Sequence, residues 1–181
     1  GVAIATKDGF LYLINRKTHK LIYRAAATTI LNHEVEPTPQ GVRYCPGIFG
    51  GMEWSSPGFD PLNHSLVVGA VDWCSTVTLD QSQPFVRGNL YGRGTFKMDP
   101  KGRGWVRSFG AATGQEKWKF RADAPVLSGI TPTAGGVTFV GDMGGTLYAF
   151  RSSNGEVLGK WDTKGAIAGG IITYRLDERQ Y

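Results

Sequence analysis

Short stretches in which apolar and polar residues alternate recur along the chain, and each ends in a tight turn. In segments such as 9–19 and 145–155, a strand-like alternation with a period of two runs into a pair of turn residues, after which a second strand follows. The turn pairs are rich in Asn, Gly, Thr and His, which tolerate a positive φ. No long stretch shows the 3.6-residue period of a helix. The pattern therefore predicts an all-β protein built from hairpins.

The hairpins are copies of one unit. They are found at GFLYLINRKTH (9–19), GTLYAFRSSNG (145–155), GWVRSFGAATGQEKW (104–118) and, more weakly, FDPLNHSLVV (59–68). The first two copies share identical residues at three positions: Gly9 with Gly145, Leu11 with Leu147, and Tyr12 with Tyr148. The turns near positions 19, 64, 114 and 155 are 45, 50 and 41 residues apart, which is the length of a four-stranded sheet with its connections. This spacing predicts the blades of a β-propeller.

One hairpin of this kind cannot bury both of its faces, whereas blades stacked around an axis cover one another. We therefore expect residues 1–181 to form one partial β-propeller domain of about four blades. A β-sandwich is the alternative, but it does not explain the recurring Gly-x-Leu-Tyr phase. Residues 26–56 and 81–104 are rich in Gly, Pro and polar residues. They are expected to be long loops at one end of the blades, where propellers often carry function.

Composition narrows the class of protein. With 41% hydrophobic residues and 26 glycines, the 181 residues can form a compact domain with many tight turns, which excludes disordered and collagen-like chains. The longest apolar runs are pieces such as residues 66–71, so no segment is expected to span a membrane. The chain begins inside a strand-like run, without Met or a leader, which suggests a fragment.

A basic stretch covers residues 87–107 and contributes to the net charge of +5. Aromatic residues lie between its cations, and Asp99 is its single acidic residue. The cations are Arg87, Arg93, Lys97, Lys101, Arg103 and Arg107. Such a segment can bind a phosphate backbone through charge and stacking. We expect no nucleic acid, however, and interpret the stretch as a solvated loop or as a docking surface for an acidic redox partner.

Three longer segments resemble, in order, the C-terminal half of the eight-bladed propeller of pyrroloquinoline quinone (PQQ) dependent alcohol dehydrogenases. They are IATKDGFLYLINRKTHKLI (4–22), CPGIFGGMEWSSPGFDPLNHSLVVGAVDWC (45–74) and TPTAGGVTFVGDMGGTLYAFRSSNGEV (131–157). The hairpin units are similar to the quinoprotein repeat of the same family. The resemblance implies part of an eight-bladed β-propeller, less than half of a full enzyme, with PQQ and a calcium or lanthanide ion as cofactors.

Cys45 and Cys74 are the only cysteines of the chain. In the family that the chain resembles, this segment carries a disulfide, so the resemblance implies a Cys45–Cys74 bond. The alternative is a pair of reduced, buried thiols. A disulfide indicates an oxidising compartment, which for a quinoprotein is the periplasm. A zinc site is not expected, since two cysteines and three dispersed histidines lack ligand spacing.

Lys7 stands where the family has a Lys or Arg against the quinone oxygens. A quinone that accepts a hydride gains negative charge on its oxygens, and a fixed ammonium beside them stabilises that charge. The resemblance therefore implies that Lys7 contacts the cofactor. The alternative is an ordinary turn lysine beside Asp8.

Trp54 matches a family tryptophan on the loop that reaches the PQQ pocket, and its alternative role is blade packing. The two glycines before it let backbone amides approach a carboxylated ligand. Glu53 is a candidate cofactor contact that departs from the family, which usually has a neutral amide at this position. A carboxylate beside a tricarboxylate cofactor is repelled unless it is protonated, turned away or paired.

Ser128 is a further candidate cofactor contact, because the family tends to have Trp-Gly-Gly at positions 127–129 and those residues approach the cofactor. The calcium ligands and the aspartate general base of the family lie on blades before the stretch resembled. They are therefore expected outside this chain. Neither Asp72 nor Asp142 is assigned such a role merely because it is acidic.

The resemblance implies a fragment of a periplasmic PQQ-dependent dehydrogenase. Such an enzyme oxidises alcohols, polyols or sugars by hydride transfer and passes electrons to a cytochrome c or a quinone. The alternative is a non-catalytic quinoprotein-like propeller that serves as a binding or assembly scaffold. Glu53 and the absent Trp-Gly-Gly favour the scaffold, whereas Lys7 and the cysteine pair favour the enzyme. Because about four blades leave open edge strands and apolar surface, we expect the chain to self-associate.

Overall fold

The computed structural model describes residues 1–89 and 91–181, and within these ranges the regular structure consists of β-strands. The first blade is the sheet β1 (Val2–Ala5), β2 (Phe10–Ile14) and β3 (Leu21–Ala26), in that order. The second blade, in sheet order, is β5 (Gly58–Asp60), β6 (Ser65–Asp72), β9 (Arg103–Gly110) and β10 (Glu116–Ala122). The third is β11 (Thr131–Pro132), β12 (Val137–Gly141), β13 (Thr146–Arg151) and β14 (Val157–Asp162).

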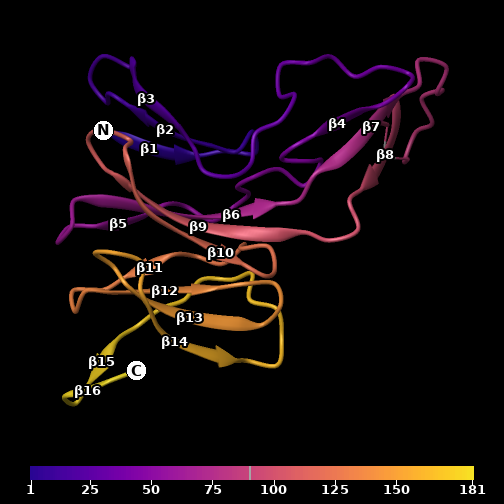
Figure 1. Cartoon of the computed structure of the whole chain (residues 1–181). Coiled ribbons are helices and arrows are strands. Elements are labelled where there is room, and N and C mark those ends of the chain that lie inside the picture. Colours follow the sequence, from indigo (N-terminus) through magenta and orange to yellow (C-terminus); the bar gives the residue numbers. More distant parts are fainter. Residues whose placement is uncertain (90) are drawn as a thin grey trace.

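Two smaller sheets complete the described chain. The insert sheet consists of β4 (Val42–Tyr44), β7 (Ser75–Leu79) and β8 (Gly94–Met98) and lies to one side of the blades (Figure 1). The strands β15 (Arg175–Leu176) and β16 (Arg179–Gln180) pair near the C-terminus. Neighbouring strands are antiparallel in every sheet of the described residues. No helix in residues 1–89 and 91–181 has the length and apolar character needed to cross a membrane.

The three blades lie one above another and bury two apolar layers between them (Figure 1). The strand β6 of the second blade is buried along its whole length because it faces both layers. Its Leu66, Val68 and Ala70 pack toward the first blade, whereas Val67 packs toward the third. Because successive side chains of a strand point to opposite faces, β6 contributes to the interface with the first blade and to the interface with the third. The stacked blades confirm the all-β, partial propeller architecture.

An aromatic side chain of each of the first two blades lies on a turn glycine of the next blade. Tyr23 of β3 packs on Gly114, and Trp118 of β10 packs on Gly155. A Cβ atom at Gly114 would lie 2.5 Å from Tyr23 Cδ2, so only glycine permits this approach. The hydroxyl of Tyr23 donates to the carbonyl of Ala111 at 3.2 Å. The repeat therefore encodes the contact between blades as well as each hairpin.

The turn near position 64 does not mark a blade of its own, contrary to our reading of the repeat. It joins β5 to β6 in the same sheet that holds the turn at 114, between β9 and β10. Both turns contain a residue with positive φ, His64 at 46° and Gly114 at 69°, so their local chemistry is alike. Only the pairing of β6 with β9, across the insert, shows that they share one blade.

The segments 26–56 and 81–104, expected to be loops, contain the strands β4 and β8 of the insert sheet. The strand β4 pairs with β7 across the intervening β5 and β6, and β8 pairs with β7 across the long connection 80–93, so local patterns do not reveal either pairing. Residue 90, within 81–104, lies outside the described residues. The cations of the basic stretch 87–107 differ in exposure. The Arg107 side chain is 16% exposed and pairs with Glu116 at 3.2 Å, whereas Lys97 is exposed on β8.

Candidate functional site

The turns at 6–9 and 142–145, together with the segments 45–54 and 163–170, meet at one end of the blades. Hydrogen bonds tie them to one another: Gly51 N donates to Lys7 O at 2.8 Å, and Ile167 N donates to Asp142 O at 3.0 Å. We call this region the loop end. It is opposite the turns at 19, 114 and 155, because adjacent antiparallel strands reverse direction at each turn. Lys7, Glu53 and Trp54 all belong to the loop end.

The segment 47–54 is fitted between the first and second blades by its glycines. Gly51 N donates to Lys7 O, and Gly51 O accepts from Val71 N at 2.7 Å. A Cβ atom at Gly51 would lie 2.5 Å from Gly9 Cα, so any larger residue would separate the two segments. Gly50 adopts φ +77°, and a Cβ atom there would lie 2.9 Å from Lys7 Cε. The glycines therefore bring Glu53 close to Lys7.

Lys7 and Glu53 form an ion pair. Lys7 Nζ lies 3.1 Å from Glu53 Oε1, and the side chains are 63% and 18% exposed, respectively. Of the three ways in which an acid could be accommodated at position 53, the structure shows pairing. The adjacent Asp8 faces its own turn: its carboxylate accepts from Phe10 N at 3.1 Å and from Tyr12 OH at 2.5 Å. Lys7 is therefore paired with Glu53 and not with its sequence neighbour.

Trp54 lies on the surface of the loop end rather than in a blade interface. The residue is 68% exposed, and its Nε1 donates to Ala168 O at 3.1 Å. One edge of the indole is thus fixed while much of the ring remains accessible. This arrangement suits stacking against a flat ligand and argues against a role in blade packing.

Ser128 is buried and serves the third blade. Its hydroxyl accepts from Gly141 N at 2.8 Å and donates to Gly129 O at 3.0 Å. These bonds engage the hydroxyl within the blade and hold the start of that blade against β12. The structure therefore pairs Lys7 with Glu53, leaves Trp54 exposed at the same loop end, and gives Ser128 a structural contact.

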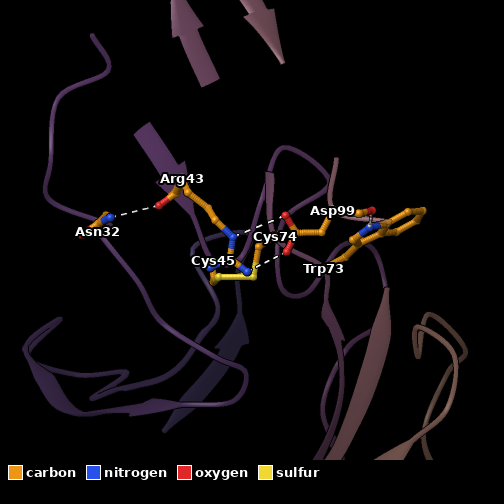
Figure 2. Close-up of polar contacts among 6 residues, drawn as sticks. All are labelled: Asn32, Arg43, Cys45, Trp73, Cys74 and Asp99. Carbon is orange, nitrogen blue, oxygen red and sulfur yellow. Dashed lines mark hydrogen bonds and ion pairs between the residues drawn. A yellow bond between two sulfur atoms is a disulfide. The ribbon is translucent and has the colours of Figure 1, made fainter. Parts of the chain in front are cut away.

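The cysteine pair forms the disulfide that the resemblance implies, between Cys45 and Cys74. Figure 2 shows the polar contacts around it. Arg43 Nη2 lies 2.6 Å from Asp99 Oδ2, and the indole of Trp73 donates to Asp99 O at 2.8 Å. The hydrogen bond from Arg43 holds the pKa of Asp99 below its usual value. The disulfide thus joins the end of β4 to the start of β7, and the Arg43–Asp99 pair joins β4 to the end of β8, so both links hold the insert sheet together.

An ion pair between the buried Asp72 and the partly exposed Arg121, at the end of β6, was not predicted from the sequence. Asp72 is 7% exposed, pairs with Arg121, and accepts from Trp105 Nε1 at 3.0 Å. The Arg121 guanidinium lies 4.4 Å above the Trp105 ring centre. Residues 72 and 121 are far apart in the chain, so no local signal could reveal the pair. Asp72 therefore has a structural partner.

Asp142 is likewise a structural residue, since it organises the β12–β13 turn. Its carboxylate accepts from Thr146 N at 2.9 Å and from Tyr148 OH at 2.8 Å. The pKa of Tyr148 is raised to about 12, mainly by burial and secondly by the hydrogen bond from its hydroxyl to Asp142. Within residues 1–89 and 91–181, no group of three or more His, Cys, Asp or Glu is placed to hold a metal ion.

The stacked antiparallel blades, two with four strands and the first with three, form a partial quinoprotein β-propeller. Comparison with solved structures supports this fold. A europium-containing methanol dehydrogenase superposes with a TM-score of 0.84 at 24% identity, covering 98% of this chain and 35% of that one. A quinohemoprotein alcohol dehydrogenase from Comamonas testosteroni gives 0.82 at 21% identity, covering 98% and 30%.

Sequence comparison confirms the resemblance to quinoprotein alcohol and methanol dehydrogenases. The putative dehydrogenase XoxF of Paracoccus denitrificans is 30% identical over 165 residues, which cover 87% of this chain and 26% of the relative. The lanthanide-dependent methanol dehydrogenase of Methylacidiphilum fumariolicum is 27% identical over 197 residues, covering 97% and 32%. A family model described as outer membrane protein assembly factor BamB matches residues 102–171. The chain spans 23% to 34% of the length of the first curated relatives it matches.

Proposed function

We propose that this chain is part of a periplasmic PQQ-dependent dehydrogenase that oxidises alcohols, polyols or sugars. The similarity to methanol and alcohol dehydrogenases over nearly the whole chain supports this proposal. PQQ supplies the hydride acceptor of such a reaction, and a calcium or lanthanide ion polarises it. We expect the metal ligands and the general base to lie outside this chain.

The proposal rests chiefly on the position of the Lys7 ammonium. Its ammonium is largely exposed at the loop end, and its backbone is anchored by Gly51. A fixed positive charge there would stabilise the negative charge that develops on quinone oxygens. The exposed ring of Trp54 would contribute a flat wall to the same site. The residues present thus suit a planar anion, although the carboxylate of Glu53 opposes it.

The compartment and the electron acceptor form part of the same proposal. The Cys45–Cys74 disulfide favours an oxidising compartment, which supports the periplasm. We propose a cytochrome c or a quinone as the electron acceptor. Relatives that carry cytochrome c in their names include two methanol dehydrogenase subunits and a lupanine 17-hydroxylase. The exposed cations of the basic stretch, such as Lys97, would attract an acidic redox partner.

A non-catalytic scaffold is the second candidate function. Two observations favour it: the match of residues 102–171 to the assembly-factor model, and the neutralisation of Lys7 by Glu53. In this case the propeller would bind or assemble other proteins, and no quinone would occupy the loop end.

A calorimetric titration with PQQ and calcium distinguishes the two functions. If the chain contributes to a cofactor site, we expect it to bind PQQ, and Lys7→Ala should weaken binding about tenfold or more. Absence of binding, both by this chain and by a longer protein that contains it, would contradict the dehydrogenase and favour the scaffold. Equal binding by the Lys7→Ala variant would contradict the role of Lys7.

A further inference from the structure

Glu53 is held against Lys7 by the fold and not by an accidental approach of two surface side chains. The carboxylate belongs to a side chain that is only 18% exposed, whereas its partner is 63% exposed. Two hydrogen bonds join the backbone before Glu53 to the backbone around Lys7: Gly51 N donates to Lys7 O at 2.8 Å, and Met52 N donates to Thr6 O at 3.3 Å. Glu53 therefore cannot move far from the ammonium without opening the segment.

The glycine next to this pair keeps the space between the two side chains small. Gly50 adopts φ +77°, and a Cβ atom there would lie 3.0 Å from Glu53 Oε1 and 2.9 Å from Lys7 Cε. The side chains fill the room that the missing Cβ leaves. A ligand that approaches Lys7 Nζ consequently meets the carboxylate of Glu53 in the same small region.

We propose that Glu53 is an internal counter-ion of Lys7 that weakens the binding of the anionic quinone. The inference rests on the proposed function, since it concerns the same cofactor. A quinone with carboxylates must share Lys7 with Glu53 or displace it, and it is repelled by the carboxylate at short range. Glu53 is thus a residue that sets cofactor affinity, and a neutral amide at position 53 would leave the ammonium free for the ligand.

The first experiment compares PQQ binding by the wild-type chain, Glu53→Gln and Glu156→Gln, using calorimetry in the presence of calcium. Glu156→Gln is the matched control, because it removes one negative charge from an exposed pair with Arg151, near the turn at 155 and away from the loop end. We expect Glu53→Gln to bind PQQ about tenfold more tightly than the wild type. The control should bind as the wild type does.

The second measurement needs no cofactor. The rate at which acetic anhydride modifies Lys7, followed by mass spectrometry of its peptide, should rise in Glu53→Gln, because the carboxylate no longer holds the amine in an ion pair. It should be unchanged in Glu156→Gln. An unchanged rate in Glu53→Gln would show that the pair is absent in solution, and it would overturn the inference whatever the binding result.

The binding outcomes separate the inference from the function on which it rests. Wild-type binding without a gain in Glu53→Gln would overturn the role of Glu53 and leave the dehydrogenase proposal standing. If neither the wild type nor Glu53→Gln binds PQQ, either as this chain or within a longer protein that contains it, the proposed function fails, and the cofactor role of Glu53 fails with it. If Glu156→Gln also binds PQQ more tightly than the wild type, the change in net charge explains the gain in affinity, and the inference is overturned.

Discussion

The indole of Trp118 lies on Gly155 of the following blade. A Cβ atom at Gly155 would be 2.6 Å from Trp118 Cε3, and Trp118 Nε1 donates to Ser152 O at 2.8 Å. The third blade has Gly159 where the first two have Tyr23 and Trp118, and the ring of Trp161 from the same blade lies over it. The contacts between blades can therefore be tested one residue at a time.

Trp118→Phe should lower the free energy of unfolding by about 1 to 3 kcal/mol, because it removes the N–H donor and leaves the carbonyl of Ser152 without this partner. Trp118→Ala should cost about 3 to 5 kcal/mol, since it also empties the interface. Urea unfolding measures both. Trp161→Phe is the control, with 52% exposure and an expected change within about 0.5 kcal/mol. Equal effects of Trp118→Phe and Trp161→Phe would contradict the assigned contact.

Gly155→Ala should destabilise the protein more than Gly136→Ala. The two glycines have φ of 75° and 77°, so the backbone strain of an alanine is nearly the same. A Cβ atom at Gly136 meets nothing within 4 Å, whereas at Gly155 it would meet the Trp118 ring. We expect a difference of about 1 to 3 kcal/mol in urea unfolding, the usual cost of overpacking. Similar losses in the two variants would show that the turn, and not the ring, requires glycine.

Removal of the disulfide should destabilise the protein by about 3 to 4 kcal/mol, as expected when a bond closes a loop of this length. The two cysteines are 29 positions apart in the sequence. Thermal unfolding of the wild type with and without dithiothreitol checks this, beside a Cys45→Ala/Cys74→Ala variant. The reductant should not affect the double variant. No loss on reduction of the wild type would contradict a stabilising role for the bond.

Tyr148 should make stability fall at alkaline pH. Its pKa is raised to about 12 by burial and by the hydrogen bond to Asp142, whereas an exposed tyrosine ionises near 10. The folded state therefore binds the proton more tightly than the unfolded state does. The stabilisation is complete below pH 10 and is lost as the pH rises through about 12.

Unfolding free energies at pH values between 9 and 11.5 test this dependence. Tyr148→Phe should lose less stability over that interval than the wild type, although it is less stable at neutral pH without its bond to Asp142. Parallel pH profiles for the two proteins would rule out the raised pKa as a contributor.

Self-association is expected from the outer faces of the blades. Ile4 of the first blade and Leu158 and Trp161 of the third are 41%, 44% and 52% exposed. Exposed apolar side chains and open strand edges favour pairing with another surface. Static light scattering at rising protein concentration should show species larger than the monomer. A monodisperse monomer would count against this expectation.

The hairpins could be read from the sequence because their requirements are local. The residues at 19, 114 and 155 all adopt positive φ, as turn residues of their type allow, and the strands before them alternate as expected. The same local rule also applied to His64, and for that reason it could not tell a turn within a blade from a turn of a new blade. The strand β4 was not predicted because it pairs with β7 across two intervening strands, and β8 was not predicted because the connection 80–93 separates it from β7.

For the candidate site, too, the sequence predicted some features and the tertiary structure decided others. Residue types and motif order were enough to single out Lys7, Glu53 and Trp54, because charge and aromatic character are properties of the residues themselves. The Lys7–Glu53 pair, the bond from Trp54 to Ala168 and the internal engagement of Ser128 depended on the folded chain. An ion pair requires two charges within a few ångströms, and only the packing of Gly50 and Gly51 between the blades brings these residues that close.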